Sequence, residues 1–446
     1  MKVAWFVALF SAICLEGLGR KYLPAIPAVA FYFLKDIILL FGFLRFRPPA
    51  PVRGMQRLLY RGFETVWIAG FAWTLLEMFN PEHMSFPLAL VGIRAYWLWW
   101  LAPSVIAGVL MHSKRKQNAI YALIVMSGFI AVMAAMQFAS PSDSALNLYT
   151  VRDGQEIYAA DVATVASTGR ARVASTFSFV SGFTDFTILV PTLLLSIGLE
   201  AKDRRLRRYA LLGTLGAAAV IPMSGSRSSV VAAGLVLAIG MWSAGLFFTR
   251  LGRRILLGGI VAVFLSLFAF PEAMSGVESR FQNREETTGR FAEAATFLPP
   301  YALMALDYPV MGIGTGMQQN ARSSMGAYSK WEAEGEVGRL LIELGPVGYM
   351  LIWLSKLGLM IALFRAYQIL KRAGRRGAAG CALSYTVLTM VGSLVFDHVY
   401  QALYFVGCGF ILAEVASLAR SPQATPAQAA SPSGADAPAP APAPAV

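Results

Sequence analysis

The stretch DYPVMGIGTG at residues 307–316 lies in the one long polar interruption of an otherwise apolar chain, and WEAEGEVGRLLIELG at residues 331–345 covers the end of this interruption and the start of the next apolar segment. This interruption runs from residue 272 to about residue 340 and lies between apolar segments that look membrane-spanning. It carries basic, glycine-rich and acidic features in that order. A membrane protein with one such loop on one face is expected to do its chemistry there.

The rest of the chain has the composition of a multi-spanning membrane protein. Of its 446 residues, 57% are hydrophobic and 14% are charged, and about 20 apolar residues suffice to cross a bilayer. We predict an all-α polytopic domain over residues 1–420 with about twelve transmembrane helices, although short segments could reduce the count to ten or eleven. The candidate segments are 3–18, 23–44, 63–79, 86–112, 118–138, 176–199, 209–223, 227–249, 255–271, 341–363, 379–396 and 399–417.

Basic residues predict how the chain is oriented. Five short alternate loops hold 21 of the 38 Lys and Arg residues, and the positive-inside rule makes this face cytoplasmic. Both termini are then expected in the cytoplasm, and the loops at 139–175 and 272–340 on the outer face of the membrane. The net charge of +13 therefore orients the protein and does not indicate nucleic-acid binding. The basic loops lie within residues 45–61, 114–116, 202–208, 250–254 and 365–376.

Neither a metal site nor a disulfide framework is predicted. The three cysteines all lie in apolar segments, and only three histidines are present, so no zinc-ligand spacing exists. We expect no metal and no other cofactor. Residues 421–446 are rich in Pro and Ala and are expected to be a disordered cytoplasmic tail.

The loop at 139–175 contains a hairpin signal followed by two arginines. Asp153-Gly154 lies between alternating residues and predicts a β-hairpin. Arg170 and Arg172 lie on a second extended run, where two arginines on one side of a strand could clamp a phosphate or diphosphate. The alternative interpretation is that both snorkel to the membrane interface.

The turn SGSRSS at 224–229 gives a sharper signal. Arg227 lies between two apolar segments with almost no loop, on the face where positive charge is disfavoured. An arginine there is costly unless it faces a polar cavity or an anionic partner. We therefore favour a functional role for Arg227 over a structural one.

The long loop supplies further candidates. Arg290 precedes an expected surface helix over 291–306, and Gly312, Gly314 and Gly316 follow it; the simplest interpretation of these glycines is a flexible loop with positive φ angles. Acidic residues then lead into an apolar helix, on which Glu336, Arg339 and Glu343 share one face. Alternatively, the acidic residues form a solvated first turn that the helix dipole favours.

Charges inside the apolar segments are functional candidates by default. Lys35 and Asp36 could instead satisfy each other as a pair. The last helical hairpin turns at Asp397-His398 on the outer face, and His398 is the one histidine considered for catalysis.

These features together resemble the O-antigen ligase/polymerase family of bacterial membrane glycosyltransferases. GRARVASTFSFVSGF at 169–183 is similar to the family's pattern of an arginine followed by Thr-Phe at the entry to a helix. SGSRSS at 224–229 is similar to the family's "SR" turn. The stretch from Gly289-Arg290 through DYPVMGIGTG to RLLIELGPVGY at 339–349 is similar to its large periplasmic loop and following helix. The likeness in order covers residues 160–415.

The resemblance implies lipid-linked sugar chemistry outside the inner membrane. Such enzymes transfer a glycan from undecaprenyl diphosphate to an acceptor sugar without a metal. Arg172, Arg227 and Arg290, with Arg170 beside them, would bind the diphosphate. Membrane lipid is an expected partner, and chain-length regulators and flippases are candidate protein partners.

One departure from the family favours a polymerase. Ligases that load glycan onto lipid A-core usually carry a histidine in the long loop, and residues 272–340 contain none. Glu336 is the first candidate for the general base and Glu334 the second, with Arg339, Glu343 and His398 as additional candidates. The alternatives are an O-antigen ligase and, from another class, a flippase or transporter, for which the internal repeats common in such folds are missing.

Overall fold

The structure, a computed structural model, describes residues 1–23, 26–82, 85–147, 149–153, 156–160, 171–269, 298–319, 322, 329–333 and 335–419. Within these residues the chain is almost entirely helical, and two short strands form one hairpin. The α-helices are α1 (Lys2–Cys14), α2 (Glu16–Tyr22), α3 (Ala28–Arg45), α4 (Ala50–Tyr60), α5 (Glu64–Leu76), α6 (Phe86–Trp97), α7 (Ala102–Leu110), α8 (Ser113–Ala139), α9 (Val180–Glu200), α10 (Arg204–Ala219), α11 (Arg227–Ser243), α12 (Arg250–Ala269), α15 (Pro299–Ala305), α16 (Glu336–Arg372), α17 (Arg376–Val391) and α18 (His398–Leu418). The remaining elements are the 3-10 turns η1 (Glu77–Phe79), η2 (Leu98–Leu101) and η3 (Ile221–Ser224) and the strands β1 (Tyr149–Asp153) and β2 (Glu156–Ala160).

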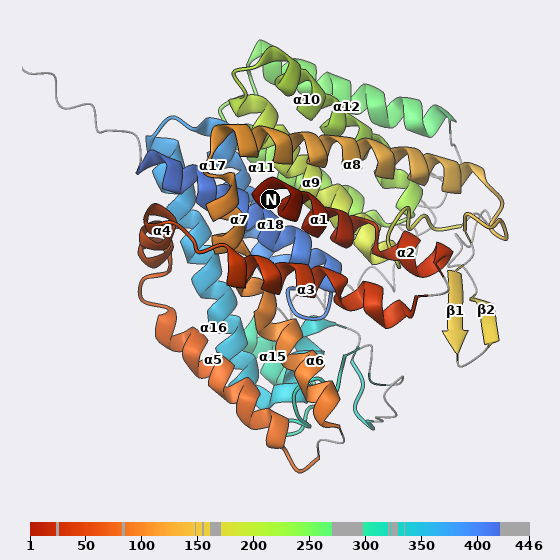
Figure 1. Ribbon diagram of the computed structural model, residues 1–446, viewed down its shortest axis with the longest axis vertical. Coiled ribbons are helices and arrows are strands. Elements are labelled where there is room, and N and C mark those ends of the chain that lie inside the picture. Colours follow the sequence, from red (N-terminus) through yellow and green to blue (C-terminus); the bar gives the residue numbers. More distant parts are fainter. Residues whose placement is uncertain are drawn as a thin grey trace, which may run out of the picture.

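Helices α9 and α18 form the centre of the helix bundle (Figure 1). In the most apolar stretch of each helix, 83% of the residues are buried in α9 and 89% in α18, whereas only 33% are buried in α8 at the periphery. The outer helices instead point large apolar side chains away from the core, as Ile68 (69% exposed), Val125 (71%) and Phe268 (81%) show. An apolar exterior around a packed interior is typical of a protein whose surrounding solvent is lipid.

Among the described residues, five helical segments are long and apolar enough to span a membrane, or six if α1 and α2, joined at a 63° bend, count as one. The prediction of an all-α membrane protein is confirmed at this level. Each of the twelve predicted segments falls on a helix of the structure. However, α5 with 13 residues and α17 with 16 are shorter than the roughly 20 residues of a full crossing. The number twelve therefore stays a prediction.

The basic loops gather at one end of the bundle, which we call the basic end. Arg365 donates a hydrogen bond to the backbone carbonyl of Arg61 at 3.0 Å, and Arg375 forms an ion pair with Glu200 at 3.3 Å. These contacts connect the loops around α4, between α9 and α10, and between α16 and α17. Gly380 near the start of α17 lies close to the last turn of α11, so the loop between α11 and α12 also lies at the basic end.

The two ends of the described chain also lie at the basic end. The amine of Lys2 is 5.7 Å from the ring centre of Phe46, which follows α3. Lys116 at the start of α8 forms an ion pair with Glu414 in the last turns of α18. The chain therefore begins and leaves the bundle on the same side as the basic loops.

The predicted hairpin is confirmed, because β1 pairs antiparallel with β2 and Asp153 lies opposite Glu156. Figure 1 shows it at the end of the molecule away from α4, which we call the opposite end. Of the helix expected over 291–306, only residues from 298 onward are described, and there α15 covers Pro299–Ala305. The tail over 421–446 lies outside the described residues.

Candidate functional site

Arg172, in the segment before α9, lies against the tight turn that opens α11. Its Nε donates a hydrogen bond to the backbone carbonyl of Ser224 at 3.3 Å. Ser224 ends η3, and three residues later Arg227 begins α11, so the structure brings Arg172 next to the backbone of Arg227. Arg170, Arg290 and the side chain of Arg227 lie outside the described residues.

Arg172 also lines a small pocket with Lys21, Gln137, Asn147 and Ser175. Ser175 has a φ of 51°, which is uncommon for a residue with a Cβ atom. The side-chain amide of Gln137 holds this conformation, accepting from the Ser175 amide at 2.7 Å and donating to its carbonyl at 2.9 Å. Lys21, which the sequence analysis did not single out, supplies a second cation to the pocket that Arg172 lines.

Residues 312–319, which we call the glycine loop, are buried between η1, α6 and α16. Gly312, Gly314 and Gly316 have φ angles of 75°, 101° and 97°, so the positive values expected from the sequence are present. A Cβ atom on Gly316 would lie 2.2 Å from the backbone carbonyl oxygen of Leu88. Glycine is therefore required for the loop to approach α6 so closely.

Glu343 of α16 anchors the glycine loop. Its carboxylate is fully buried and accepts hydrogen bonds from the amides of Gly316 (3.0 Å) and Gln318 and from the hydroxyl of Tyr96 (2.8 Å). Both carboxylate oxygens have donors. The geometry therefore gives Glu343 a structural role in holding the loop against α6 and α16.

Glu336 opens α16 and joins it to the segment between α17 and α18. One carboxylate oxygen pairs with Lys356 at 2.8 Å, and the other accepts from the Ser393 hydroxyl at 2.7 Å and the Val395 amide at 2.9 Å. These three donors occupy three of the roughly four lone-pair sites of the carboxylate, and each of them favours its charged form over the protonated one. Glu334, the second candidate for the base, lies outside the described residues.

Arg339 lies one turn after Glu336, but the ion pair of Glu336 is with Lys356 and not with Arg339. The Arg339 Nε donates to the backbone carbonyl of Ala333 at 2.9 Å, and its guanidinium lies 5.5 Å from the ring centre of Phe396. Glu336 and Arg339 thus both reach the segment before α18, whereas Glu343 reaches the glycine loop.

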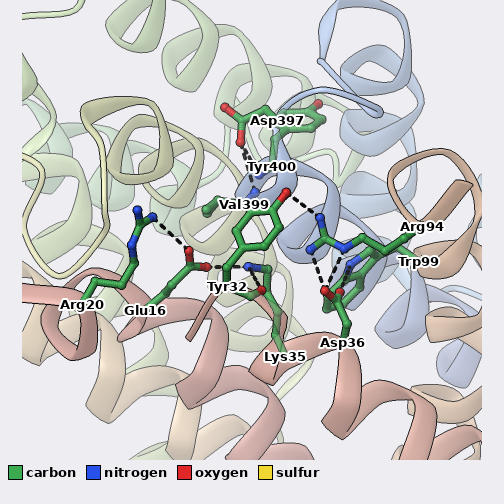
Figure 2. Close-up of polar contacts among 10 residues, drawn as sticks. All are labelled: Glu16, Arg20, Tyr32, Lys35, Asp36, Arg94, Trp99, Asp397, Val399 and Tyr400. Carbon is green, nitrogen blue, oxygen red and sulfur yellow. Dashed lines mark hydrogen bonds and ion pairs between the residues drawn. The ribbon is translucent and has the colours of Figure 1, made fainter. Parts of the chain in front are cut away.

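Two buried ion pairs lie where α2, α3 and α6 meet (Figure 2). Lys35 pairs with Glu16, and Arg94 pairs with Asp36 at 2.6 Å. Lys35 is 0% exposed and Asp36 3%. The alternative in which Lys35 and Asp36 pair with each other is not the arrangement in the structure, because consecutive residues on a helix point in different directions.

Tyr32 lies beside both pairs (Figure 2). The Arg94 guanidinium donates to the Tyr32 hydroxyl at 2.7 Å and lies 4.4 Å from the centre of its ring. The Trp99 indole donates to the second oxygen of Asp36 at 3.0 Å. Every charge in this group therefore has a partner, as burial requires.

The second turn of α9 and the start of α18 place three more titratable residues near Tyr32, and we call Asp185, Asp397 and His398 the α9–α18 cluster. The rings of Tyr32 and His398 are 5.2 Å apart in an edge-to-face arrangement. Asp397 caps α18 by accepting two backbone amides at 3.1 Å each (Figure 2). The carboxyl group of Asp185 interacts with that of Asp397.

The α9–α18 cluster holds buried polar atoms without partners. Within the described residues, Oδ2 of Asp185 and Nδ1 of His398 have no hydrogen-bond partner, although both side chains are partly accessible. Most buried polar atoms in proteins are paired, so an unpaired one calls for an explanation such as catalysis or a bound water or ion. The sequence analysis named His398 but missed Asp185. The signal was present, because Asp185 is an ionisable residue inside the apolar segment 176–199.

Chemically, the opposite end offers cations in one place and a carboxyl group in another. Arg172 and Lys21 are the cations, and they also donate to the backbone carbonyls of Ser224 and Leu146, whereas Asp185 is the carboxyl group. No group of three His, Cys, Asp or Glu side chains within the described ranges is arranged to hold a metal ion.

Comparison with known proteins does not identify a family for this chain. No family model matches the chain, and no curated protein matches it either.

Proposed function

We propose that this chain is a glycosyltransferase of the bacterial inner membrane that polymerises undecaprenyl-diphosphate-linked oligosaccharide repeat units. The product would be O-antigen or exopolysaccharide, formed on the periplasmic face. The reaction would need no metal or other cofactor.

The observation that carries this proposal is the position of Arg172 against the turn that opens α11. Helix α10 runs from the basic end to this turn over 16 residues, or about 24 Å at the rise of an α-helix. A planar guanidinium matches the oxygens of a phosphate or diphosphate, and Arg227 begins the adjacent helix. Cations at the end opposite the basic loops suit an anionic leaving group that a membrane lipid presents there.

The chemistry requires a base as well as these cations. The acceptor hydroxyl attacks the anomeric carbon of the donor sugar, and the diphosphate leaves with the bonding electrons. The transfer therefore needs a proton acceptor and stabilisation of the leaving charge. The sequence assigns the base to Glu336 or Glu334, with Arg170, Arg172, Arg227 and Arg290 on the diphosphate.

The proposed topology has twelve spans, both termini in the cytoplasm and the loop at 272–340 in the periplasm. Reporter fusions after Arg376 and within residues 318–329 should then report opposite compartments. Reporters that work on the same side would overturn the topology and, with it, the location of the site.

The activity is tested with purified protein and one defined undecaprenyl-diphosphate-linked repeat unit. We expect products of two or more repeats still attached to undecaprenyl diphosphate. Transfer only to added lipid A-core would identify a ligase. Movement of the lipid-linked unit across a proteoliposome membrane without a new glycosidic bond would identify a transporter instead.

A further inference from the structure

Several carboxylates in the described polar core differ in how many donors they have, and Glu77 and Asp397 each have donors on one oxygen. Glu16, Asp36, Glu336 and Glu343 have a hydrogen-bond donor or a cation on both oxygens. Asp185 differs, because its Oδ2 is a buried atom without a donor among the described residues.

The neighbours of Asp185 do not provide a cation that would neutralise it. Its carboxyl group forms a hydrogen bond with that of Asp397, so the two share a proton, and Asp397 also caps α18 through two backbone amides. His398 follows Asp397 and also leaves a buried ring nitrogen unpaired. Lys35 and Arg94, the nearby cations, are already paired with Glu16 and Asp36.

These unpaired atoms suit a hydroxyl-bearing ligand. A sugar hydroxyl can donate its proton to a carboxylate oxygen and exchange a hydrogen bond with an imidazole nitrogen. The Asp185 and His398 side chains are partly accessible, and a ligand reaches their buried atoms Oδ2 and Nδ1 when these side chains rotate, whereas the ion pairs behind Tyr32 are 0–9% exposed along their side chains.

We propose that Asp185 is the catalytic base of the glycosyl transfer and that Asp185 and His398 bind the acceptor sugar; this inference rests on the proposed function. The acceptor O–H bond breaks and its proton passes to Oδ2 of Asp185. The acceptor oxygen bonds to the anomeric carbon, whose bond to the diphosphate oxygen breaks. The electron pair leaves with undecaprenyl diphosphate, and Asp185 then returns its proton to solvent or to the departing diphosphate.

This assignment divides the site between two sets of residues. Arg172 and Arg227 lie beside the turn before α11 and act on the leaving group. Asp185 in the second turn of α9 and His398 at the start of α18 act on the acceptor.

The first experiment measures kcat and KM of the purified full chain in lipid nanodiscs with a defined undecaprenyl-diphosphate-linked repeat unit. We expect Asp185→Asn to lower kcat by about 10²–10⁴-fold at similar KM, and Asp185→Glu to recover part of the rate. Wild-type kcat should fall at low pH as the base becomes protonated, and the residual rate of Asp185→Asn should lose this dependence. Asp203→Asn, at the cap of α10, is the matched control and should turn over normally. A kcat for Asp185→Asn within threefold of wild type would overturn the proposal.

A second experiment does not depend on turnover. Dicyclohexylcarbodiimide reacts with protonated carboxyl groups, and mass spectrometry locates the labelled residues. At a pH low enough to protonate Asp185 and abolish its action as a base, Asp185 should be labelled at least tenfold faster than Glu343, whose oxygens are both occupied. Equal rates would overturn the proposal even if the wild-type protein makes no polymer, an outcome that would separately refute the proposed function.

Discussion

The glycine loop and the α9–α18 cluster are both polar regions inside an apolar bundle, but they differ in how many hydrogen-bond donors surround a buried carboxyl group. Glu343 in the first is fully buried and accepts three hydrogen bonds. Asp185 in the second keeps an oxygen without a donor in the described part of the chain. Satisfied polar groups stabilise a fold, whereas unsatisfied ones cost stability and persist where function needs them. We therefore expect substitutions in the two regions to separate stability from turnover.

The largest effect is expected from Gly316→Ala in the glycine loop. The added methyl group would meet a backbone oxygen of α6 at 2.2 Å, at a φ of 97°, and backbone cannot rotate away as a side chain can. We expect a loss of about 4 kcal/mol or more, seen as little folded protein in membranes. Gly54→Ala in α4, with nothing within 4 Å of the new Cβ, is the control and should leave protein levels unchanged. Wild-type levels of Gly316→Ala would show that the loop does not pack as described.

Glu343→Gln should have the next largest effect. An amide cannot accept from both the Gly316 and Gln318 amides, because its NH2 group would face one of them. We expect a destabilisation of about 3 kcal/mol, measured by chemical unfolding in detergent, with turnover per folded molecule close to wild type. Tyr96→Phe removes one donor only and should cost about half as much. Normal stability with abolished turnover would instead make Glu343 a catalytic residue.

Arg227→Lys should lower turnover while leaving the amount of folded protein unchanged. Lysine keeps the charge but loses the planar fork, and one lost charge-assisted hydrogen bond corresponds to about 10–100-fold in rate. Arg170→Lys should be milder. Arg205→Lys, at the basic end, provides the matched control. If Arg227→Ala polymerises normally, the diphosphate site does not include this residue.

Glu336→Gln should have the smallest effect. The amide oxygen can still accept from Ser393 and Val395, so only the ion pair with Lys356 is lost. We expect a destabilisation of about 1 kcal/mol and turnover within a few-fold of wild type. A fall of about 10²–10⁴-fold in kcat would support the base assignment made from the sequence and argue against Asp185.

The sequence predicted the helices well, because long apolar segments interrupted by basic loops leave few alternatives. It also predicted the β1–β2 hairpin from Asp153-Gly154. It could not say which charges pair: Lys35 bonds to Glu16, 19 residues away, and Glu336 to Lys356 and Ser393, contacts that only helix packing decides. Asp185 could have been named from the sequence, because it is an ionisable residue inside the apolar segment 176–199, but its contact with the distant Asp397 and its unpaired oxygen are properties of the packed structure.

The contrast between the two regions is tested most directly by measuring unfolding free energy and turnover per folded molecule for Asp185→Asn and Glu343→Gln in the same preparation. We predict a crossed result: Glu343→Gln loses stability and keeps its turnover, and Asp185→Asn keeps or gains stability and loses turnover. Loss of stability in Asp185→Asn comparable to that of Glu343→Gln, with normal turnover in the molecules that remain folded, would contradict it.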